Sequence, residues 1–369
     1  MHYAGSRGRS KDEFGDSKKA NARDTAMKIL FLGLGSMGQR HLQNIQKLQK
    51  EKKLPDNLEF FGLVRPEDRH RVIREGQEKK VADISEYYGM TPVVSWTEAK
   101  KVRPDAVFVT NPSSLHIPSA LEFARLGSDL FIEKPLGHTT RGLSELERIV
   151  KSKKLITMVG FQTRFNPLVT KIKDLVGSKR GRIISAAFTW NTFLPAHHIY
   201  EDYSKGYAAR KDLGGGVVLG LIHEIDLVCY LLGLPKKVIA VGGKLSNLHM
   251  NVEDTVAALL LYAKKGKTFP VTLRLSYAQT KEVRKFEFQF EDSTLFVDSV
   301  GNRYALYGKE GELVEEKTDS TIRNELFEAE VLHLFECVNV RKESNVNIVE
   351  ARKSLQVAFA IKRQIAKKV

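Results

Sequence analysis

The chain has 369 residues, of which 42% are hydrophobic and 28% are charged, a composition typical of a globular protein long enough for two domains. Its two cysteines, Cys229 and Cys337, are too few for a disulfide framework, so a reducing cytoplasm is the expected compartment. No apolar run approaches the ~18 residues that span a bilayer, and the net charge of +15 is scattered without a recognition module. We therefore expect neither a membrane nor a nucleic acid as partner.

The beginning of the chain differs from the rest. Residues 1–26 mix charges of both signs with glycine and serine and lack the apolar core of a signal peptide, which predicts a disordered leader. A nucleic-acid partner recruited by the basic residues of this leader is kept as an alternative.

Strands and helices alternate over the next stretch. The run from Lys28 to Gly33 is apolar and β-prone without alternation, as in a parallel strand buried on both faces. A helical pattern from Ser113 to Leu126 ends at Gly127. Further strand-like runs lie at 59–64, 105–110, 129–132 and 155–159. This alternation predicts an α/β fold with a doubly wound parallel sheet, the Rossmann architecture, and we place this domain at residues 27–150.

The alternation then stops. Asn166-Pro167 predicts the start of a helix that ends at Gly177, and a strongly apolar helix is expected over 217–232. Two helices, at 325–341 and 350–367, are expected to pack back on the domains. Strand-like runs lie at 183–190, 238–245, 256–262, 271–275, 286–290 and 294–297. Residues 151–369 are therefore expected to form an α+β domain on a large, mainly antiparallel sheet.

A glycine-rich turn at 33–38 joins the first strand to a helix. Gly33 permits the tight turn, Gly35 lets the backbone approach a pyrophosphate, and Gly38 lets the helix pack close to the strand. The amino end of the helix attracts negative charge, so Ser36 and Met37 are also expected to contact a dinucleotide. A structural turn without a ligand is the alternative.

The second predicted strand ends in Leu63-Val64-Arg65. An NAD site usually carries Asp or Glu at this tip, where the carboxylate binds the ribose hydroxyls and repels a 2′-phosphate. Because the tip has no acid and Arg65 is available, NADP(H) is favoured over NAD(H), the alternative being an arginine that is simply exposed to solvent.

Polar residues follow two neighbouring strands. Glu133-Lys134-Pro135 comes directly after 129–132, at the carboxyl edge where doubly wound folds bind ligands. Pro135 stiffens the exit and would aim Lys134 into the crevice, although a surface lysine is the ordinary interpretation. Glu133 and Lys134 are thus expected beside the cofactor. The preceding strand is followed by a second set of expected nicotinamide and ribose contacts, Thr110, Asn111, Pro112 and His116.

Gly214-Gly215-Gly216 opens the apolar helix, and His223 lies one turn beyond Gly220 on the same predicted face. A hydrogen-bonded core histidine is one interpretation. A triple glycine, however, allows close backbone approach to another group and is hard to explain by packing alone, so His223 is a catalytic candidate. The segment 223–226 is not the H-E-x-x-H zinc pattern, and no metal is proposed.

Five segments stand in an order that is typical of one family: Gly-Leu-Gly-Ser-Met-Gly-Gln-Arg-His at 33–41, Thr-Asn-Pro-Ser-Ser-Leu-His at 110–116, Glu-Lys-Pro at 133–135, Gly-Phe-Gln-Thr-Arg-Phe-Asn-Pro at 160–167 and the region 214–226. In these segments the chain resembles the Gfo/Idh/MocA family of NAD(P)-dependent oxidoreductases. The resemblance covers 27–369 and implies a homo-oligomer formed through the outer face of the second sheet. It also implies that Lys134 and His223 are the catalytic residues.

The stretch from Tyr200 to Arg210 is similar to family members found with bacterial surface-sugar pathways, including those of sialic-acid-like sugars. This similarity implies a sugar or nucleotide-sugar substrate, the alternative being an ordinary loop packed on the sheet. The candidate substrate contacts are Arg164, His197, His198, Tyr203, Tyr207, Arg210 and His223.

The chain departs from the family at one position. An aspartate usually stands one turn before the histidine, where this chain has Gly220. Glycine supplies neither charge nor hydrogen bond, and inside a helix it costs about 1 kcal/mol relative to alanine. It could make room for a bulkier substrate, with Asp226, Asp202 or a water taking over. Two functions therefore stay open: hydride transfer to or from a sugar-like substrate, and an NAD(P)-binding sensor or regulator that lacks this chemistry.

Overall fold

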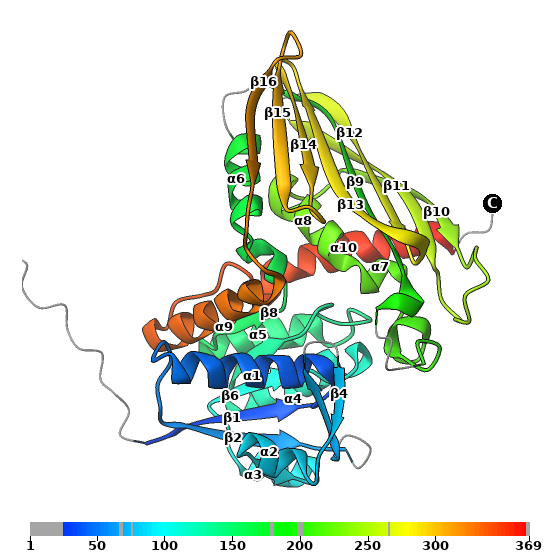
Figure 1. Cartoon of the computed structure of the whole chain (residues 1–369). Coiled ribbons are helices and arrows are strands. Elements are labelled where there is room, and N and C mark those ends of the chain that lie inside the picture. The colour runs from blue at the N-terminus through cyan, green and yellow to red at the C-terminus, as the bar shows by residue number, and fades with distance from the viewer. Residues whose placement is uncertain are drawn as a thin grey trace, which may run out of the picture.

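The computed structural model describes residues 25–65, 69–74, 77–177, 181–197, 202–264 and 266–366. The predicted leader therefore lies outside the described residues except for 25 and 26. The described residues form a first domain around one sheet, a second domain around a larger sheet, and two C-terminal helices that run back between them (Figure 1).

The first sheet has six strands in the order β5-β2-β1-β6-β7-β8, and all five neighbouring pairs are parallel. Every residue of β6 and β7 is buried, which explains their uninterrupted apolar sequences. The strand order reverses between β1 and β6, so their carboxyl ends form the switch point at which such sheets bind ligands. The strands are β1 (Met27–Leu32), β2 (Leu58–Leu63), β5 (Thr91–Val93), β6 (Ala106–Val109), β7 (Asp129–Ile132) and β8 (Thr157–Val159). The predicted Rossmann sheet is confirmed.

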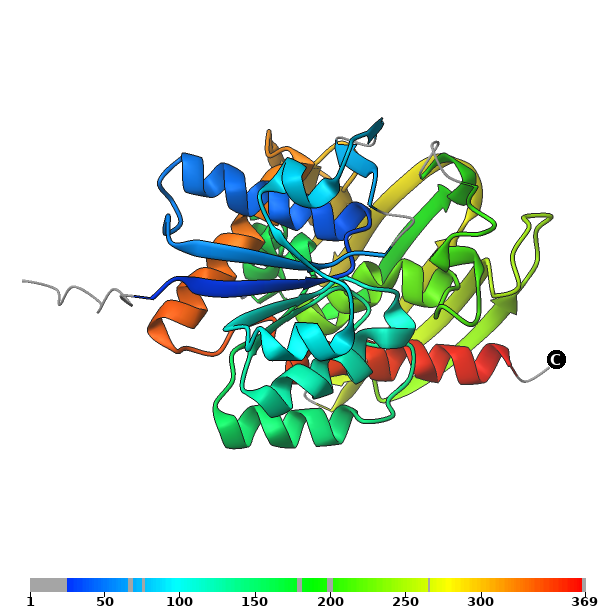
Figure 2. The same ribbon diagram turned by 90° about the horizontal axis from the view of Figure 1, so that it is seen from below.

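Helices cover both faces of this sheet. Helix α1 (Ser36–Lys50) lies on one side, and α4 (His116–Leu126) and α5 (Leu143–Lys153) lie on the other (Figure 2). A short 3-10 turn, η2 (Ser113–Leu115), leads into α4. The remaining elements of this domain are short and lack a clear sequence period: β3 (Arg71–Arg74), β4 (Gln77–Lys80), α2 (Ile84–Tyr88) and α3 (Trp96–Lys101). Sequence periodicity missed these four elements for that reason.

The second sheet has eight strands in the order β10-β11-β12-β9-β13-β14-β15-β16. Its neighbouring pairs are antiparallel apart from β12 and β9, which run parallel. The strands are β9 (Ile183–Phe193), β10 (Lys237–Gly243), β11 (Thr255–Lys264), β12 (Lys267–Ser276), β13 (Ala278–Phe290), β14 (Ser293–Asp298), β15 (Arg303–Gly308) and β16 (Leu313–Thr318). The mainly antiparallel second sheet is confirmed, with two more strands, β15 and β16, than the sequence patterns indicate.

Helices line the face of this sheet that looks toward the first domain (Figure 1). Helix α6 is Pro167–Gly177, as predicted. The single helix predicted over 217–232 is wrong, because the segment forms α7 (Val217–Gly220) and α8 (Ile222–Leu232) with a break at Leu221. The Glu224 amide donates to the Leu221 carbonyl instead of reaching back to Gly220. The Gly220 carbonyl accepts a hydrogen bond from Lys134, so a cation from the other domain takes the place of one helical bond.

The C-terminal helices join the two domains. Helix α9 (Arg323–Val340) lies against α1, where the Lys47 ammonium donates to Glu328 at 2.7 Å. The connection to α10 (Ile348–Ile365) runs beside β8, and the Val159 amide donates to the Val346 carbonyl at 2.9 Å. Because β8 belongs to the first sheet, that sheet continues past residue 150, where the sequence places the domain boundary.

Candidate active site

The glycine-rich turn forms a cradle at the amino end of α1. Gly35 is the residue before the helix, no side chain caps it, and the first turn carries no acidic residue, so the first amides of α1 face the crevice. A Cβ at Gly35 would meet no atom within 4 Å, whereas one at Gly38 would overlap the Gly33 carbonyl. Gly33 has a φ of +104°, which only glycine adopts readily. The uncapped amides and the open space at Gly35 fit a dinucleotide pyrophosphate.

The segment after β6 closes the side of this cradle. The Thr110 hydroxyl donates to the Gly33 carbonyl at 2.6 Å, and the Asn111 side-chain amide donates to Ser119 at 2.8 Å. The Asn111 Oδ1 atom is buried and has no hydrogen-bond partner among the described residues. An unpartnered buried acceptor at the switch point fits a polar group of a bound cofactor.

His116 and Pro112 hold this segment in place. The two ring nitrogens of His116 lie 2.7 Å from the Pro135 carbonyl and 2.8 Å from the Asn111 carbonyl, so the imidazole links the exits of β6 and β7. Burial lowers the pKa of His116 despite these hydrogen bonds. Pro112 precedes η2 and begins the turn into α4.

Glu133 lies below the crevice and is buried. Its carboxylate accepts from the His41 ring at 2.7 Å and from the Lys134 amide at 3.0 Å. Burial raises the pKa of Glu133, but the hydrogen bond from His41 and the nearby charge of Lys134 outweigh burial and hold the pKa below its usual range. Glu133 therefore acts as a fixed anion that orients the loop carrying Lys134.

Lys134 and His223 come from different domains, and they lie close enough for the charge of Lys134 to lower the pKa of His223. The Lys134 Nζ atom donates to the Gly220 carbonyl at 3.1 Å, immediately before the helix that carries His223. His223 is 3% exposed, and its Nδ1 atom lies 3.4 Å from the Thr163 hydroxyl. Burial lowers the pKa of His223 well below its usual range, and the positive charges of Lys134 and Arg284 lower it further.

The expectation that packing alone would not explain the triple glycine is wrong, because close packing accounts for all three glycines. A Cβ at Gly214 would lie 2.6 Å from the Cβ of His138 and 2.6 Å from the Ser113 hydroxyl. Gly216 has a φ of +108°, and a Cβ there would overlap the Glu253 carboxylate. The Ser113 hydroxyl also donates to the Leu213 carbonyl at 2.9 Å. The glycines thus let the second domain dock against the segment after β6, which brings α7 and α8 to the crevice.

The space next to Gly220 is filled by Tyr277, which sequence reasoning missed. A Cβ at Gly220 would overlap the Tyr277 hydroxyl, and Tyr277 is 2% exposed. The two acids that the sequence suggests for this place are elsewhere. Asp226 is bound to Arg164, and Asp202 accepts from the Ser204 hydroxyl in an exposed turn. A tyrosine between two strands has no sequence signal of its own, so only the folded chain reveals this contact.

Arg164 lies behind the site. Its guanidinium forms two hydrogen bonds of 2.7 Å with the Asp226 carboxylate, and both side chains are almost completely buried. Ser354 of α10 donates to the same carboxylate at 2.7 Å, and the Arg164 guanidinium also lies 4.7 Å from the centre of the Tyr230 ring. The pair therefore ties η3 (Gln162–Phe165) to α8 and α10.

The candidate substrate loop borders the triple glycine. The Tyr203 hydroxyl accepts from the His249 amide at 3.0 Å. Tyr207 is 38% exposed, and Arg210 is exposed and paired with Asp212. The His197 ring lies 2.9 Å from the Thr192 hydroxyl, while His198 lies outside the described residues. Arg65 follows β2 and is exposed.

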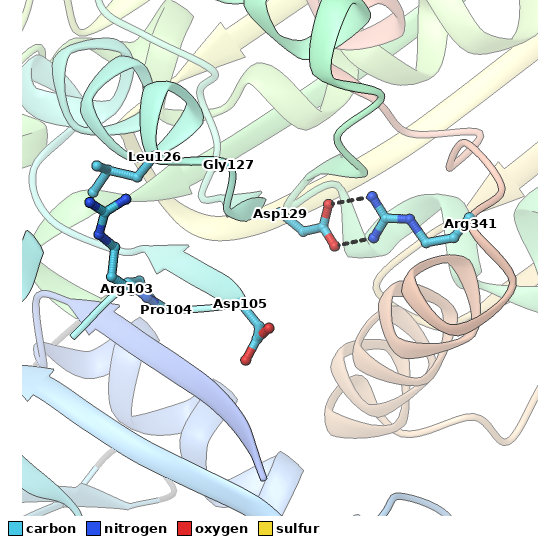
Figure 3. Close-up of a pocket in the computed structure, with 7 residues that line it drawn as sticks. All are labelled: Arg103, Pro104, Asp105, Leu126, Gly127, Asp129 and Arg341. Carbon is cyan, nitrogen blue, oxygen red and sulfur yellow. Dashed lines mark hydrogen bonds and ion pairs between the residues drawn. The ribbon is translucent and has the colours of Figure 1, made fainter. Parts of the chain in front are cut away.

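A hollow of about 300 Å³ lies at the opposite, amino edge of the first sheet. Its lining residues are Arg103, Pro104, Asp105, Leu126, Gly127, Asp129 and Arg341. Figure 3 shows the Arg341 guanidinium facing the Asp129 carboxylate, with hydrogen bonds of 2.5 and 3.2 Å. This ion pair anchors the end of α9 to the start of β7, and the hollow is remote from Lys134 because the two lie at opposite ends of β7.

Within the described ranges, no group of three or more His, Cys, Asp or Glu side chains is placed to hold a metal ion. Among the helices that the structure describes, none is both long and apolar enough to cross a membrane.

The first sheet presents a helix amino end and a lysine at its carboxyl edge, and a histidine of the second domain lies near enough for the lysine charge to lower its pKa. This arrangement is that of a nicotinamide-dependent oxidoreductase. The chain belongs to the Gfo/Idh/MocA family. Residues 27–161 match the model of the oxidoreductase family's NAD-binding Rossmann fold, and residues 169–314 match that of the GFO/IDH/MocA C-terminal domain.

Several relatives are sugar dehydrogenases by name. The chain is 25% identical over 266 residues to scyllo-inositol 2-dehydrogenase (NAD(+)) of Bacillus subtilis, covering 69% of this chain and 74% of the relative. Among solved structures, levoglucosan dehydrogenase in complex with NADH and levoglucosan has a TM-score of 0.75 at 18% identity, covering 93% of this chain and 98% of that chain. UDP-N-acetylglucosamine 3-dehydrogenase GnnA from Acidithiobacillus ferrooxidans has a TM-score of 0.69 at 18% identity, covering 92% and 98%. The solved structures establish likeness of fold.

Proposed function

We propose that this protein transfers a hydride between C4 of a nicotinamide and a carbon that bears a hydroxyl or keto group on a sugar or nucleotide sugar. The observation that carries this proposal is the distance of 3.1 Å between Lys134 Nζ and the Gly220 carbonyl, which brings the lysine of the first domain to the helix that carries His223. The names of the sugar dehydrogenases among the relatives support the substrate class.

The nicotinamide, when bound, supplies the atom that gives or takes the hydride. In the oxidation direction, His223 accepts the proton of the substrate hydroxyl, because its lowered pKa keeps the ring neutral at physiological pH. Its Nδ1 atom faces Thr163, which leaves Nε2 for this transfer. The Lys134 ammonium stabilises the negative charge that develops on the same oxygen. In reduction, His223 returns the proton to that oxygen.

The remaining site residues are proposed from their positions. The dinucleotide site would be formed by residues 33–38, Thr110, Asn111 and Glu133. Arg65 would favour NADP(H) by binding its 2′-phosphate. The exposed loop with Tyr203, Tyr207 and Arg210 would contact the substrate. The domain built on the second sheet would bind the substrate, and the first domain, which continues past residue 150 through β8, would bind the dinucleotide.

We also propose a homo-oligomer in the reducing cytoplasm. Apolar side chains lie exposed on the large sheet, including Val241 at 57% and Phe296 at 46% exposed, which supports an interface there. The buried free thiols of Cys229 and Cys337 are compatible with a reducing compartment. Sedimentation of the purified protein tests the assembly, and a monomer at micromolar concentration would contradict it.

The experiment that tests the function is a substrate screen. The protein is mixed with NAD(+) or NADP(+) and with scyllo-inositol, levoglucosan or UDP-N-acetylglucosamine, and absorbance of the reduced nicotinamide is followed. Turnover of one compound well above the others is the expected result. Tight binding of NADPH together with no turnover of a wider sugar panel would replace the enzyme with the sensor of the same fold.

A further inference from the structure

The side chain of Tyr277 reaches the site from the large sheet. Tyr277 lies between β12 and β13, where its amide donates to the Asp254 carbonyl at 2.8 Å and its carbonyl accepts from the Leu194 amide at 3.0 Å. A Cβ at Gly220 would overlap the hydroxyl and would lie 2.9 Å from the ring carbon that bears it. The hydroxyl therefore occupies the volume that a side chain at position 220 would fill.

Two polar side chains thus contact one glycine, which precedes the helix that carries a third. Gly220 accepts from Lys134 through its carbonyl, lies against the Tyr277 hydroxyl through its Cα, and is followed by the helix that carries His223. These groups come from the loop after β7, from the β12–β13 connection and from α8, so only the tertiary fold brings them near one another.

The Tyr277 hydroxyl is free to donate a hydrogen bond within the described part of the chain. The Tyr277 side chain is 2% exposed, and no hydrogen bond of its hydroxyl is found in the part of the chain that the structure describes. The hydroxyl is not one of the fully enclosed polar atoms that lack a partner, so it borders space that a ligand can reach. A ligand bound there would be the first hydrogen-bond partner of this hydroxyl. Burial raises the pKa of Tyr277 well above its usual value, and the nearby Tyr207 and Glu253 raise it further, so the group remains a protonated donor at physiological pH.

We propose that Tyr277 is a further catalytic residue, whose hydroxyl reaches past Gly220 and donates a hydrogen bond to the reacting oxygen of the substrate beside Lys134. This inference rests on the proposed function. It also explains why glycine stands in α7, since any larger residue there would displace the hydroxyl. No new bond is made or broken, because the hydrogen bond strengthens as charge develops on the oxygen.

The test compares two buried tyrosines. Tyr277→Phe removes the proposed donor, and Tyr262→Phe is the matched control, since Tyr262 is 4% exposed and donates to the Gly233 carbonyl at 3.1 Å away from the site. With the substrate found in the screen, we expect Tyr277→Phe to lower kcat by about 10- to 100-fold with little change in NADPH affinity. The control should retain its kcat. Equal kcat values for Tyr277→Phe and the wild type would overturn the inference while the proposed function stands.

A second measurement tests the contact without requiring turnover. Gly220→Ala should lower the melting temperature by several degrees, and less so when combined with Tyr277→Phe, because the hydroxyl is the atom in the way. An equal loss of melting temperature in both backgrounds would overturn the proposed contact.

If the wild type oxidises nothing in the panel, the proposed function fails. The inference is then judged on binding of UDP-N-acetylglucosamine to the NADPH complex, where Tyr277→Phe should weaken affinity about tenfold, and unchanged or absent binding would overturn it.

Discussion

The ammonium of Lys134 lies 3.1 Å from the carbonyl of Gly220, which ties the loop after β7 to the break between α7 and α8. Because this carbonyl is freed from the helix, the lysine is held in the crevice by a neutral acceptor rather than by a carboxylate. Its positive charge therefore remains available to an oxygen of the substrate.

Replacing Lys134 by methionine should abolish most of the turnover. The change removes the cation that stabilises the developing alkoxide, and we expect kcat to fall about 10²- to 10³-fold. Dinucleotide affinity, measured by fluorescence titration, should stay nearly intact. The exposed Lys281 of β13 provides the control, as Lys281→Met should turn over normally. A Lys134→Met enzyme with wild-type kcat would remove this lysine from the mechanism.

Gly35→Ala should weaken dinucleotide binding without unfolding the protein. A Cβ at Gly35 meets no protein atom within 4 Å, but it enters the space proposed for the pyrophosphate. We expect the Kd for NADPH to rise about tenfold or more, and the free energy of unfolding to change by about 1 kcal/mol at most. Gly177→Ala, at a position with equally open surroundings, is the control and should bind NADPH normally. Unchanged NADPH affinity in Gly35→Ala would contradict the proposed cradle.

The preference between cofactors should depend on Arg65. Arg65→Ala removes the guanidinium proposed to bind a 2′-phosphate, and the Kd for NADPH should rise about tenfold while that for NADH stays constant. Isothermal titration with both cofactors measures the ratio. If the two affinities change in parallel, Arg65 does not select the cofactor.

Arg164 should matter chiefly for stability. The Arg164–Asp226 pair is buried, so removing one partner leaves an uncompensated charge, and Arg164→Leu should lower the free energy of unfolding by about 3–5 kcal/mol. Combining Arg164→Met with Asp226→Leu should recover part of this loss in urea denaturation. A stable Arg164→Leu protein with a raised KM would instead favour a direct contact with substrate.

Glu330 should make stability depend on pH. It is 0% exposed, neither carboxyl oxygen has a hydrogen-bond partner among the described residues, and burial together with the Glu133 charge raises its pKa well above 4.5. The folded chain thus holds a proton that the unfolded chain releases, so stability is full below about pH 4.5 and is lost as pH rises toward the folded-state pKa. Glu330→Gln should therefore be more stable than wild type by about 1–3 kcal/mol at pH 7.5.

This difference between Glu330→Gln and the wild type should disappear at about pH 4.5. Glu336→Gln, at an exposed position on the same helix, should show no such pH dependence. A Glu330→Gln advantage that is constant with pH would show that Glu330 is ionised or paired in solution.

Local sequence patterns were sufficient for most of the fold. Apolar runs indicated five of the six strands of the first sheet, since buried parallel strands leave an uninterrupted hydrophobic signal. The glycine turn and the Glu133-Lys134 segment could also be predicted, because each lies within a few residues of the end of such a strand. The short elements between β2 and β6 could not be predicted, because elements of three to six residues show no clear hydrophobic period.

The sequence by itself therefore determined the two kinds of sheet, and it predicted the glycine turn and the candidates Lys134 and His223, because short, contiguous segments carry these signals. Only the tertiary structure decided that α7 and α8 are separate helices. It also decided that Arg164 forms an ion pair with Asp226, and that the Tyr277 hydroxyl fills the space beside Gly220. Each of these depends on contacts between distant segments, whose free energy comes from packing and charge pairing that no local pattern records.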